Sequence, residues 1–284
     1  MKKNIILILF LFLLSGISFG QRSEIGLFGG GSYYLGDLNP SKHFNLTKAA
    51  GGFLYRYNLT PRFAFKLNVL YGTLEGSDAI TRFDANRNLY FKSPILDFAG
   101  EIELNFFNYV TGNKKMMLSP YIFAGICIFH FNPKAQDTLG GKWWDLQTLG
   151  TEGQGTSMYA DRKPYSLTQL GFPFGIGVKY SLTQKICFGV EWGMRKTHTD
   201  YLDDVSTTYA DPVILAAENG PQAAYFGDRS IDHTSDHKDL QRGNPATKDW
   251  YSFAGIFLTV KLTKKQPCGS YIEGKKNYRE YYRN

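Results

Sequence analysis

The densest group of potentially reactive residues in this sequence lies in one acidic segment, residues 199–247. His233 and His237 are four residues apart within it, so they would share one face of a helix and could bind a metal ion there. The segment has no apolar helical face, however, and it is long and polar. We therefore interpret it as a solvated loop, with metal binding as the less favoured alternative.

Other candidate reactive groups stand alone. Asp200, Asp203 and Asp204 carry carboxylates suited to calcium, but the spacing of an EF-hand loop is absent. His198 has Ser and Asp residues nearby, yet there is no Gly-x-Ser-x-Gly element. The glycine run 29–31 is not followed by a helical pattern, which excludes a dinucleotide loop. We expect no catalytic residue, no metal and no cofactor; an enzyme with its site at the loop rim is the alternative.

A second set of charged residues follows a strict spacing. Between residues 96 and 106 the even positions are apolar or glycine, whereas the odd positions include Asp97, Glu101 and Glu103. Because side chains of a strand alternate between its two faces, this period of two predicts a strand with one apolar face and one acidic face.

The same period recurs in eight segments, and most of them reach ten residues. A tilted strand that crosses a bilayer needs about 9–11 residues. The second, fourth and sixth connections are short, whereas the other four are long. The predicted strands are 24–34, 47–58, 62–73, 95–107, 118–130, 165–181, 185–198 and 248–263. The long connections are 35–46, 74–94, 131–164 and 199–247.

Short turns at one end and long loops at the other are typical of an outer-membrane β-barrel. Lipid offers no hydrogen-bond partners, so a sheet in a membrane must close on itself. We therefore predict an all-β fold: a transmembrane antiparallel barrel of eight strands over residues 21–263, with long extracellular loops. An even number of strands places both termini on the periplasmic, short-turn side. A soluble two-sheet sandwich is the rival, and the strand lengths, the alternation of connections and the charged inner face disfavour it.

The composition agrees with this fold. Hydrophobic residues make up 43% of the chain and aromatic residues 16%, which excludes intrinsic disorder. Apolar runs long enough for several helical membrane spans are absent. Lys2 and Lys3 precede the apolar run 5–14 and a set of small residues, which predicts a secretory signal peptide over residues 1–20. Export argues against nucleic acid as a partner, despite the net charge of +7.

Charged residues on the predicted inner face form a candidate network in the lumen. An eight-stranded barrel is only wide enough to be filled by side chains, and buried charges must pair. We interpret the network as an ionic core that fixes the barrel, with a proton or ion path as the alternative. By parity Cys127 would face lipid and Cys187 the lumen, so we do not pair them. The predicted network is Arg56, Lys66, Asp97, Glu101, Glu103, Lys179, Glu191 and Arg195. Inward glycines that make room for it are Gly171, Gly175, Gly177, Gly189 and Gly193.

The C-terminal segment 264–284 has a different character, because it is basic, rich in tyrosine and without periodicity. Such a segment in the periplasm suits docking to a partner protein. Cys268 could form an intermolecular disulfide in that oxidising compartment. An unstructured tail with an unreactive thiol is the alternative. The candidate partner-binding residues are Cys268, Tyr271, Lys275, Lys276, Tyr278, Arg279, Tyr281 and Tyr282.

The segment from Glu24 to Pro40, EIGLFGGGSYYLGDLNP, resembles the opening of a family of Bacteroidetes outer-membrane barrels that includes PorG, a component of the type IX secretion system. The resemblance is distinctive over this first strand and its loop and generic elsewhere. It implies an outer-membrane protein, without enzymatic activity, that contacts a periplasmic ring formed by a lipoprotein and its partner protein. The tail with Cys268 would be the contact. A surface adhesin or ligand-binding barrel, working through its outer loops, is the alternative function.

Overall fold

The computed structural model describes residues 22–137, 141–232 and 236–262, and the expected signal peptide and C-terminal tail lie outside them. Eight long strands form a barrel, and two short strands and four short helices lie in its loops. The long strands are β1 (Ser23–Leu35), β2 (Lys48–Asn58), β3 (Phe63–Ser77), β4 (Tyr90–Asn105), β5 (Leu118–Phe131), β8 (Thr168–Ser181), β9 (Ile186–Thr197) and β10 (Trp250–Lys261). The loop elements are α2 (Asp78–Thr81), β6 (Lys134–Gln136), β7 (Trp143–Asp145), α3 (Leu146–Leu149), α4 (Pro212–Glu218) and α5 (Pro221–Gly227).

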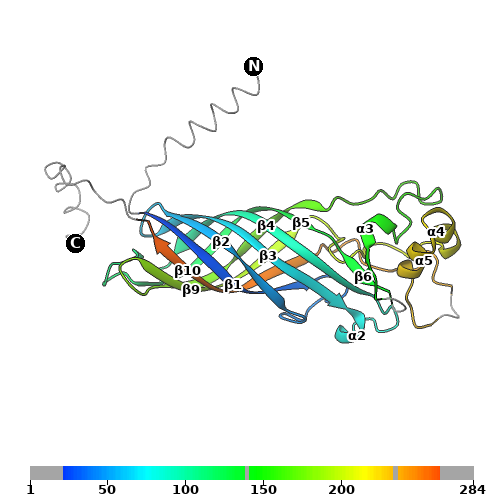
Figure 1. The fold of residues 1–284 in the computed structure, drawn as a ribbon, viewed down its shortest axis with the longest axis horizontal. Helices are drawn as coiled ribbons and strands as arrows, with labels where there is room; N and C mark the ends of the chain where they lie inside the picture. The colour runs from blue at the N-terminus through cyan, green and yellow to red at the C-terminus, as the bar shows by residue number, and fades with distance from the viewer. Residues whose placement is uncertain (1–21, 138–140, 233–235, 263–284) are drawn as a thin grey trace, which may run out of the picture.

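The long strands close into a complete ring. Each pairs in antiparallel fashion with its neighbours in the order β3-β2-β1-β10-β9-β8-β5-β4, and β3 also pairs with β4 (Figure 1). The predicted fold class and all eight predicted strands are confirmed. β3 and β4 extend several residues beyond their predicted ends, because the pair continues above the barrel rim to Ser77 and Tyr90.

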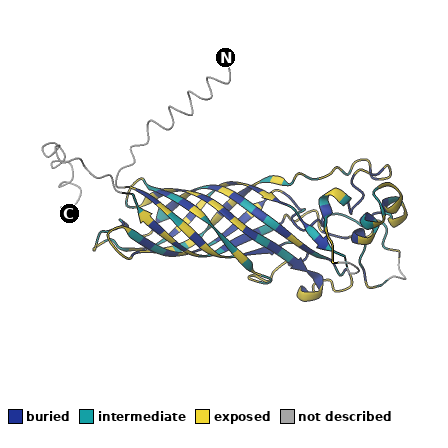
Figure 2. Ribbon diagram, viewed as in Figure 1, coloured by how far each residue is buried: buried dark blue, intermediate teal, exposed yellow. Residues whose placement is uncertain are grey.

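Exposed and buried residues alternate along the strands and form the diagonal stripes of Figure 2. Outward side chains such as Phe53 and Ile126 are 68% and 66% exposed, whereas the inward Glu101 is fully buried. An apolar outer surface around a polar interior is the reverse of a water-soluble fold and is the arrangement of an outer-membrane barrel. Among the described residues, no helix combines the length and the hydrophobicity of a membrane span.

The two ends of the barrel differ. The described ends of the chain lie at the end with the short turns, where the backbone N–H of Leu262 donates to the Ser23 carbonyl at 2.8 Å (Figure 1). The other end carries the long loops. We call the described residues of 132–166 and 198–249, which contain α3, α4 and α5, the cap.

The cap is folded, which corrects our interpretation of residues 199–247 as a solvated loop. Leu215 of α4 and Ala223 of α5 pack with Tyr159 and Ala210 in a small apolar core of their own. The Asp211 side chain caps α4 by accepting from the Val213 backbone N–H at 2.8 Å. The acidic composition of this segment concealed its core, because only a few well-spaced apolar residues are needed to form it.

Candidate functional site

The lower half of the lumen, toward the short turns, is held together by Glu103. Its carboxylate accepts from Arg56 Nε at 2.9 Å and Nη2 at 3.0 Å, and from Lys179 Nζ at 2.6 Å. All three side chains are fully buried. Arg56 also pairs with Glu24 at 3.2 Å, and the Thr259 hydroxyl donates to the same Glu24 oxygen at 2.8 Å. Sequence reasoning missed Glu24, which is the second residue of its strand and lacks the flanking alternation that identified the others.

The upper part of the network is less fully bonded. Lys66 pairs with Glu191 and lies 2.9 Å from Glu101. The contacts of Arg195 are longer: Nε lies 3.7 Å from Asp97 and Nη2 lies 3.9 Å from Glu101. The structure thus brings all eight residues of the sequence-predicted network together in the lumen, where they bridge facing walls of the barrel.

Glycines on the inner wall make room for this network. A Cβ on Gly177 would lie 2.5 Å from the Tyr121 ring, and one on Gly189 would lie 2.2 Å from the Phe257 ring. The Tyr121 hydroxyl in turn donates to Glu191 at 2.5 Å. The small residues therefore let aromatic rings lie flat against the wall and reach the charges.

The upper half of the lumen, toward the long loops, is mostly apolar. Phe91, Phe129 and Phe131 are fully buried there and belong to one continuous core with Ile95 and Phe253. Charged residues below and aromatic residues above leave the lumen filled by side chains, as expected for eight strands.

Cys127 faces this core and not lipid, which corrects the predicted orientation. It is 2% exposed, and its sulfur lies 3.6 Å from the Tyr251 hydroxyl. The prediction was wrong because β5 is apolar on both faces, with Phe129 inward and Ile128 outward, so parity could not identify the lipid side. Cys187 also points inward, and both thiols are free.

A second buried polar cluster joins the barrel rim to the cap. The Tyr34 hydroxyl at the end of β1 contacts Asp203 and lies 3.2 Å from Asp249. The backbone N–H groups of Val205 and Leu202 donate to the same two carboxyls at 3.0 and 2.9 Å. Burial raises the pKa of Asp203 and of Asp249 well above the usual range, and the neighbouring acids add to the effect. Both groups therefore favour the protonated form.

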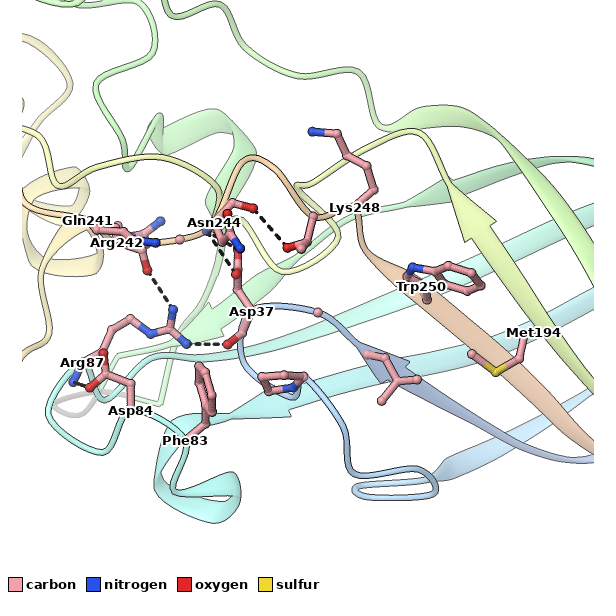
Figure 3. Close-up of a pocket in the computed structure, with 15 residues that line it drawn as sticks. Asp37, Phe83, Asp84, Arg87, Met194, Gln241, Arg242, Asn244, Lys248 and Trp250 are labelled. Atoms are coloured by element: carbon pink, nitrogen blue, oxygen red, sulfur yellow. Dashed lines mark hydrogen bonds between the residues drawn. The ribbon is translucent and has the colours of Figure 1, made fainter.

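Two arginines connect the loops around this cluster, as Figure 3 shows. Arg87 forms a bidentate pair with Asp78 at 2.7 and 2.9 Å, and its Nη2 donates to the Asp37 carbonyl at 2.8 Å. Its Nη1 donates to the Arg242 carbonyl at 2.7 Å. Arg242 in turn pairs with the buried Glu152 at 3.0 Å. These bonds hold the 36–40 loop, the β3–β4 connection and the cap in one arrangement.

The last part of the segment that carried the sequence resemblance, from Tyr34 to Pro40, lies at this junction. The position of Gly36 leaves no room for a side chain, because a Cβ there would lie 1.9 Å from an oxygen of Asp249. Leu38 is fully buried, and the Asn39 amide donates to the Tyr34 carbonyl at 2.8 Å. The residues therefore shape the loop that receives the cap.

The candidate metal-binding residues that the structure describes are not brought together as ligands. His237 lies 2.7 Å from Asp228, and His233 falls outside the described residues. Asp200 accepts from the Ser206 hydroxyl at 2.7 Å, and Asp204 accepts from Tyr165 at 2.6 Å, so each is held by its own donor. Where the structure describes the chain, no three His, Cys, Asp or Glu side chains converge as metal ligands.

The remaining predicted residues are His198 and the eight residues of the C-terminal tail. His198 is exposed, and the centre of its ring lies 5.2 Å from that of Phe172. The eight candidate partner-binding residues from Cys268 to Tyr282 lie outside the described residues.

Comparison with known proteins gives a family model and several solved structures. The model, described as a domain of unknown function (DUF6089), matches residues 2–139. No curated protein matches. Neisserial surface protein A is similar with a TM-score of 0.42 at 8% identity, covering 84% of this chain and 97% of its own. Ail of Yersinia pestis, in complex with a heparin analogue, has a TM-score of 0.40 at 6% identity, covering 86% and 99%. OprG of Pseudomonas aeruginosa has a TM-score of 0.38 at 10% identity, covering 86% and 98%.

Proposed function

We propose that this protein is a non-conducting, non-enzymatic anchor in the bacterial outer membrane, and that it is a PorG-like structural component of a type IX-like secretion machine. The observation that carries the proposal is the filled lumen. Buried ion pairs around Glu103 occupy its lower half and the rings of Phe129 and Phe131 occupy its upper half. A barrel closed in this way acts through what it presents at its two ends.

The periplasmic contact is assigned to the C-terminal tail. Leu262, the last described residue, lies at the short-turn end, so the segment that follows starts on that side. The tail carries six Lys or Arg residues against two Glu residues between positions 264 and 284, with interleaved tyrosines. Such a peptide suits docking to a periplasmic ring lipoprotein and its partner protein, and Cys268 is the candidate for an intermolecular disulfide.

Deletion of residues 266–284 tests this proposal. We expect the truncated barrel to insert, to keep the altered gel mobility of a folded barrel before heating, and to lose both cargo secretion and co-purification of the ring proteins. Cys268→Ser separates a covalent link from docking, since only a covalent link gives a mixed-disulfide band on a non-reducing gel. Normal cargo secretion by the inserted, truncated barrel would contradict the proposal.

A planar-bilayer recording tests the closed lumen separately. We expect no ion conductance from the wild-type barrel, because a path would have to cross the buried aromatic layer. Stable single-channel currents from the purified protein would contradict the anchor role even if the tail proved necessary for secretion.

A surface ligand-binding or adhesin role is the second candidate, and the folded cap favours it. The cap exposes apolar side chains to the outside, including Val213 at 73% and Ile231 at 63%. Polar substitutions at these two positions remove apolar surface without entering the cap core. If cell-surface attachment falls while cargo secretion persists, the adhesin function is favoured over the secretion function.

A further inference from the structure

A cleft of about 670 Å³ opens on one side of the molecule, where the barrel rim meets the cap (Figure 3). One wall is formed by Pro40 and by Phe83, which is 67% exposed. Asn244 and Lys248 form the opposite wall. The end of the cleft toward the barrel is apolar, and it is lined by Leu35, Met194 and Trp250.

The level of this cleft follows from the strand register. Leu35 of β1, Trp250 of β10 and Lys196 of β9 lie side by side on the outer wall. Below this row the outward residues are apolar, as at Ile256, which is 52% exposed. Tryptophan and lysine side chains mark the boundary between hydrocarbon and headgroups. The cleft therefore begins at the headgroup level of the outer leaflet and extends upward from it.

Among the described residues, two lysines at this boundary form no close ion pair, and Lys248 interacts at longer range with the charge of Asp200. Lys196 Nζ lies 5.7 Å from the centre of the Trp250 ring, and Lys248 Nζ donates to the Pro245 carbonyl at 3.0 Å. Within residues 22–137, 141–232 and 236–262, neither ammonium forms an ion pair with a carboxylate. They are thus available for an external anion.

The floor of the cleft is formed by two arginines that are paired with acids. Arg87 and Arg242 line it, but their N–H groups are already bonded to Asp78, Glu152 and backbone carbonyls. Asp78 and Glu152 compensate the charges of the two arginines, so the cation of the cleft that is left for a ligand is Lys248. The arginines shape the cleft, whereas the lysines make the contact.

We propose that this cleft binds the headgroup of an anionic, phosphate-bearing lipid of the outer leaflet. The phosphate contacts Lys248 in the cleft and Lys196, which lies beside Trp250 and outside the lining of the cleft. The polar remainder of the headgroup lies against Gln241 and Asn244. The acyl chains continue down the apolar outer wall below Trp250. A lipid fits better than a soluble anion because the apolar end of the cleft faces the hydrocarbon, and only an amphiphile uses both ends.

The test measures retained lipid by native mass spectrometry of the full-length protein, titrated with phosphatidylglycerol or with phosphatidylcholine in detergent. Each lysine near an anionic headgroup contributes about 1 kcal/mol, which is about fivefold in affinity. We expect K196Q/K248Q to weaken phosphatidylglycerol retention about 30-fold. The charge-matched control is K92Q/K134Q. Lys92 also lies near a tryptophan, 5.9 Å from the Trp143 ring, but on another part of the rim without this cleft.

Near-normal retention by the control pair, with loss in K196Q/K248Q, supports the site. Equal loss of phosphatidylglycerol retention in both double variants would show that only the overall charge matters, and would overturn the proposed site. Equal retention of phosphatidylcholine, or full displacement of the lipid by millimolar inorganic phosphate, would also overturn it, the latter in favour of a free-anion site. Gel mobility before heating identifies any variant that has not folded. If the double variant does not fold, the single variants K196Q and K248Q are compared in the same lipid titration.

Discussion

The Tyr34 hydroxyl lies between the buried carboxyls of Asp203 and Asp249. A hydroxyl has one proton, so it can donate to only one of the two, and the other must carry a proton of its own to bond to the phenol oxygen. This arrangement links the end of β1 to both ends of the 199–249 segment. One tyrosine therefore joins the barrel to two separate points of the cap.

Tyr34→Phe tests this connection. Removal of the hydroxyl leaves two buried carboxyls short of a partner, and an unsatisfied buried group costs about 1–3 kcal/mol. We expect the cap to become sensitive to protease while the barrel remains protected. Tyr180→Phe is the control, since Tyr180 is exposed on the outer wall of the barrel. Equal cap protection in wild type and Tyr34→Phe would show that the hydroxyl is dispensable.

The stability of the cap should depend on pH. Burial raises the pKa of Asp200 to about 7 and that of Asp204 to about 6. Since the ordinary value is lower, the folded cap binds more protons than the unfolded cap between about pH 4 and pH 7. Its stability therefore falls as the pH rises through this window.

Hydrogen exchange of residues 200–206, corrected for the intrinsic pH dependence, measures this effect. We expect stronger protection at pH 5 than at pH 8, and a smaller difference in Asp200→Asn, whose side chain keeps an acceptor for the Ser206 hydroxyl. Protection that increases toward pH 8 would contradict the prediction.

Glu103→Gln should strongly destabilise the barrel. The substitution leaves Arg56 and Lys179 buried next to a neutral amide, and breaking a buried ion pair costs about 3–5 kcal/mol. Urea unfolding in lipid vesicles measures the change. Glu75→Gln is the matched control, because Glu75 pairs at 2.9 Å with the more exposed Lys48, a pair worth about 1 kcal/mol or less. Similar losses of unfolding free energy in the two variants would mean that the buried ion pairs of the lumen stabilise the barrel no more than the more exposed pair does.

Gly189→Ala should destabilise the barrel through steric overlap. The new Cβ would lie 2.2 Å from the Phe257 ring and 2.7 Å from the Val178 carbonyl oxygen, and overpacking costs about 1–3 kcal/mol. Gly29→Ala is the control, since nothing lies within 4 Å of its Cβ position. The same urea titration compares them, and a neutral Gly189→Ala would show that the wall adjusts without cost.

Several features could be predicted from the sequence because they depend on local alternation. In β4 the charged residues Asp97, Glu101 and Glu103 recur at intervals of two or four, so their common face follows from strand geometry alone. The lengths of the connections likewise predicted which end of the barrel carries the loops. These signals are strong because lipid on one side and a narrow lumen on the other impose opposite chemistries on alternate residues.

Parity alone did not determine the face of Cys127. β5 places Phe129 and Ile128 on opposite sides, and both are apolar, because the upper lumen is filled by aromatic rings as well as by charges. Only the curvature of the closed barrel decides which of two apolar faces is concave.

The sequence by itself thus determined the barrel, its strands and the residues of its lumen network, since each strand reports its two environments through a period of two. Only the tertiary structure decided the cap, the role of Tyr34 and the cleft beside Trp250. Those features join segments far apart in the sequence, by 169 residues between Tyr34 and Asp203 and by 155 between Arg87 and Arg242. Contacts of that kind have no local period, because they arise when closure of the ring brings the ends of β1, β3 and β10 to one rim.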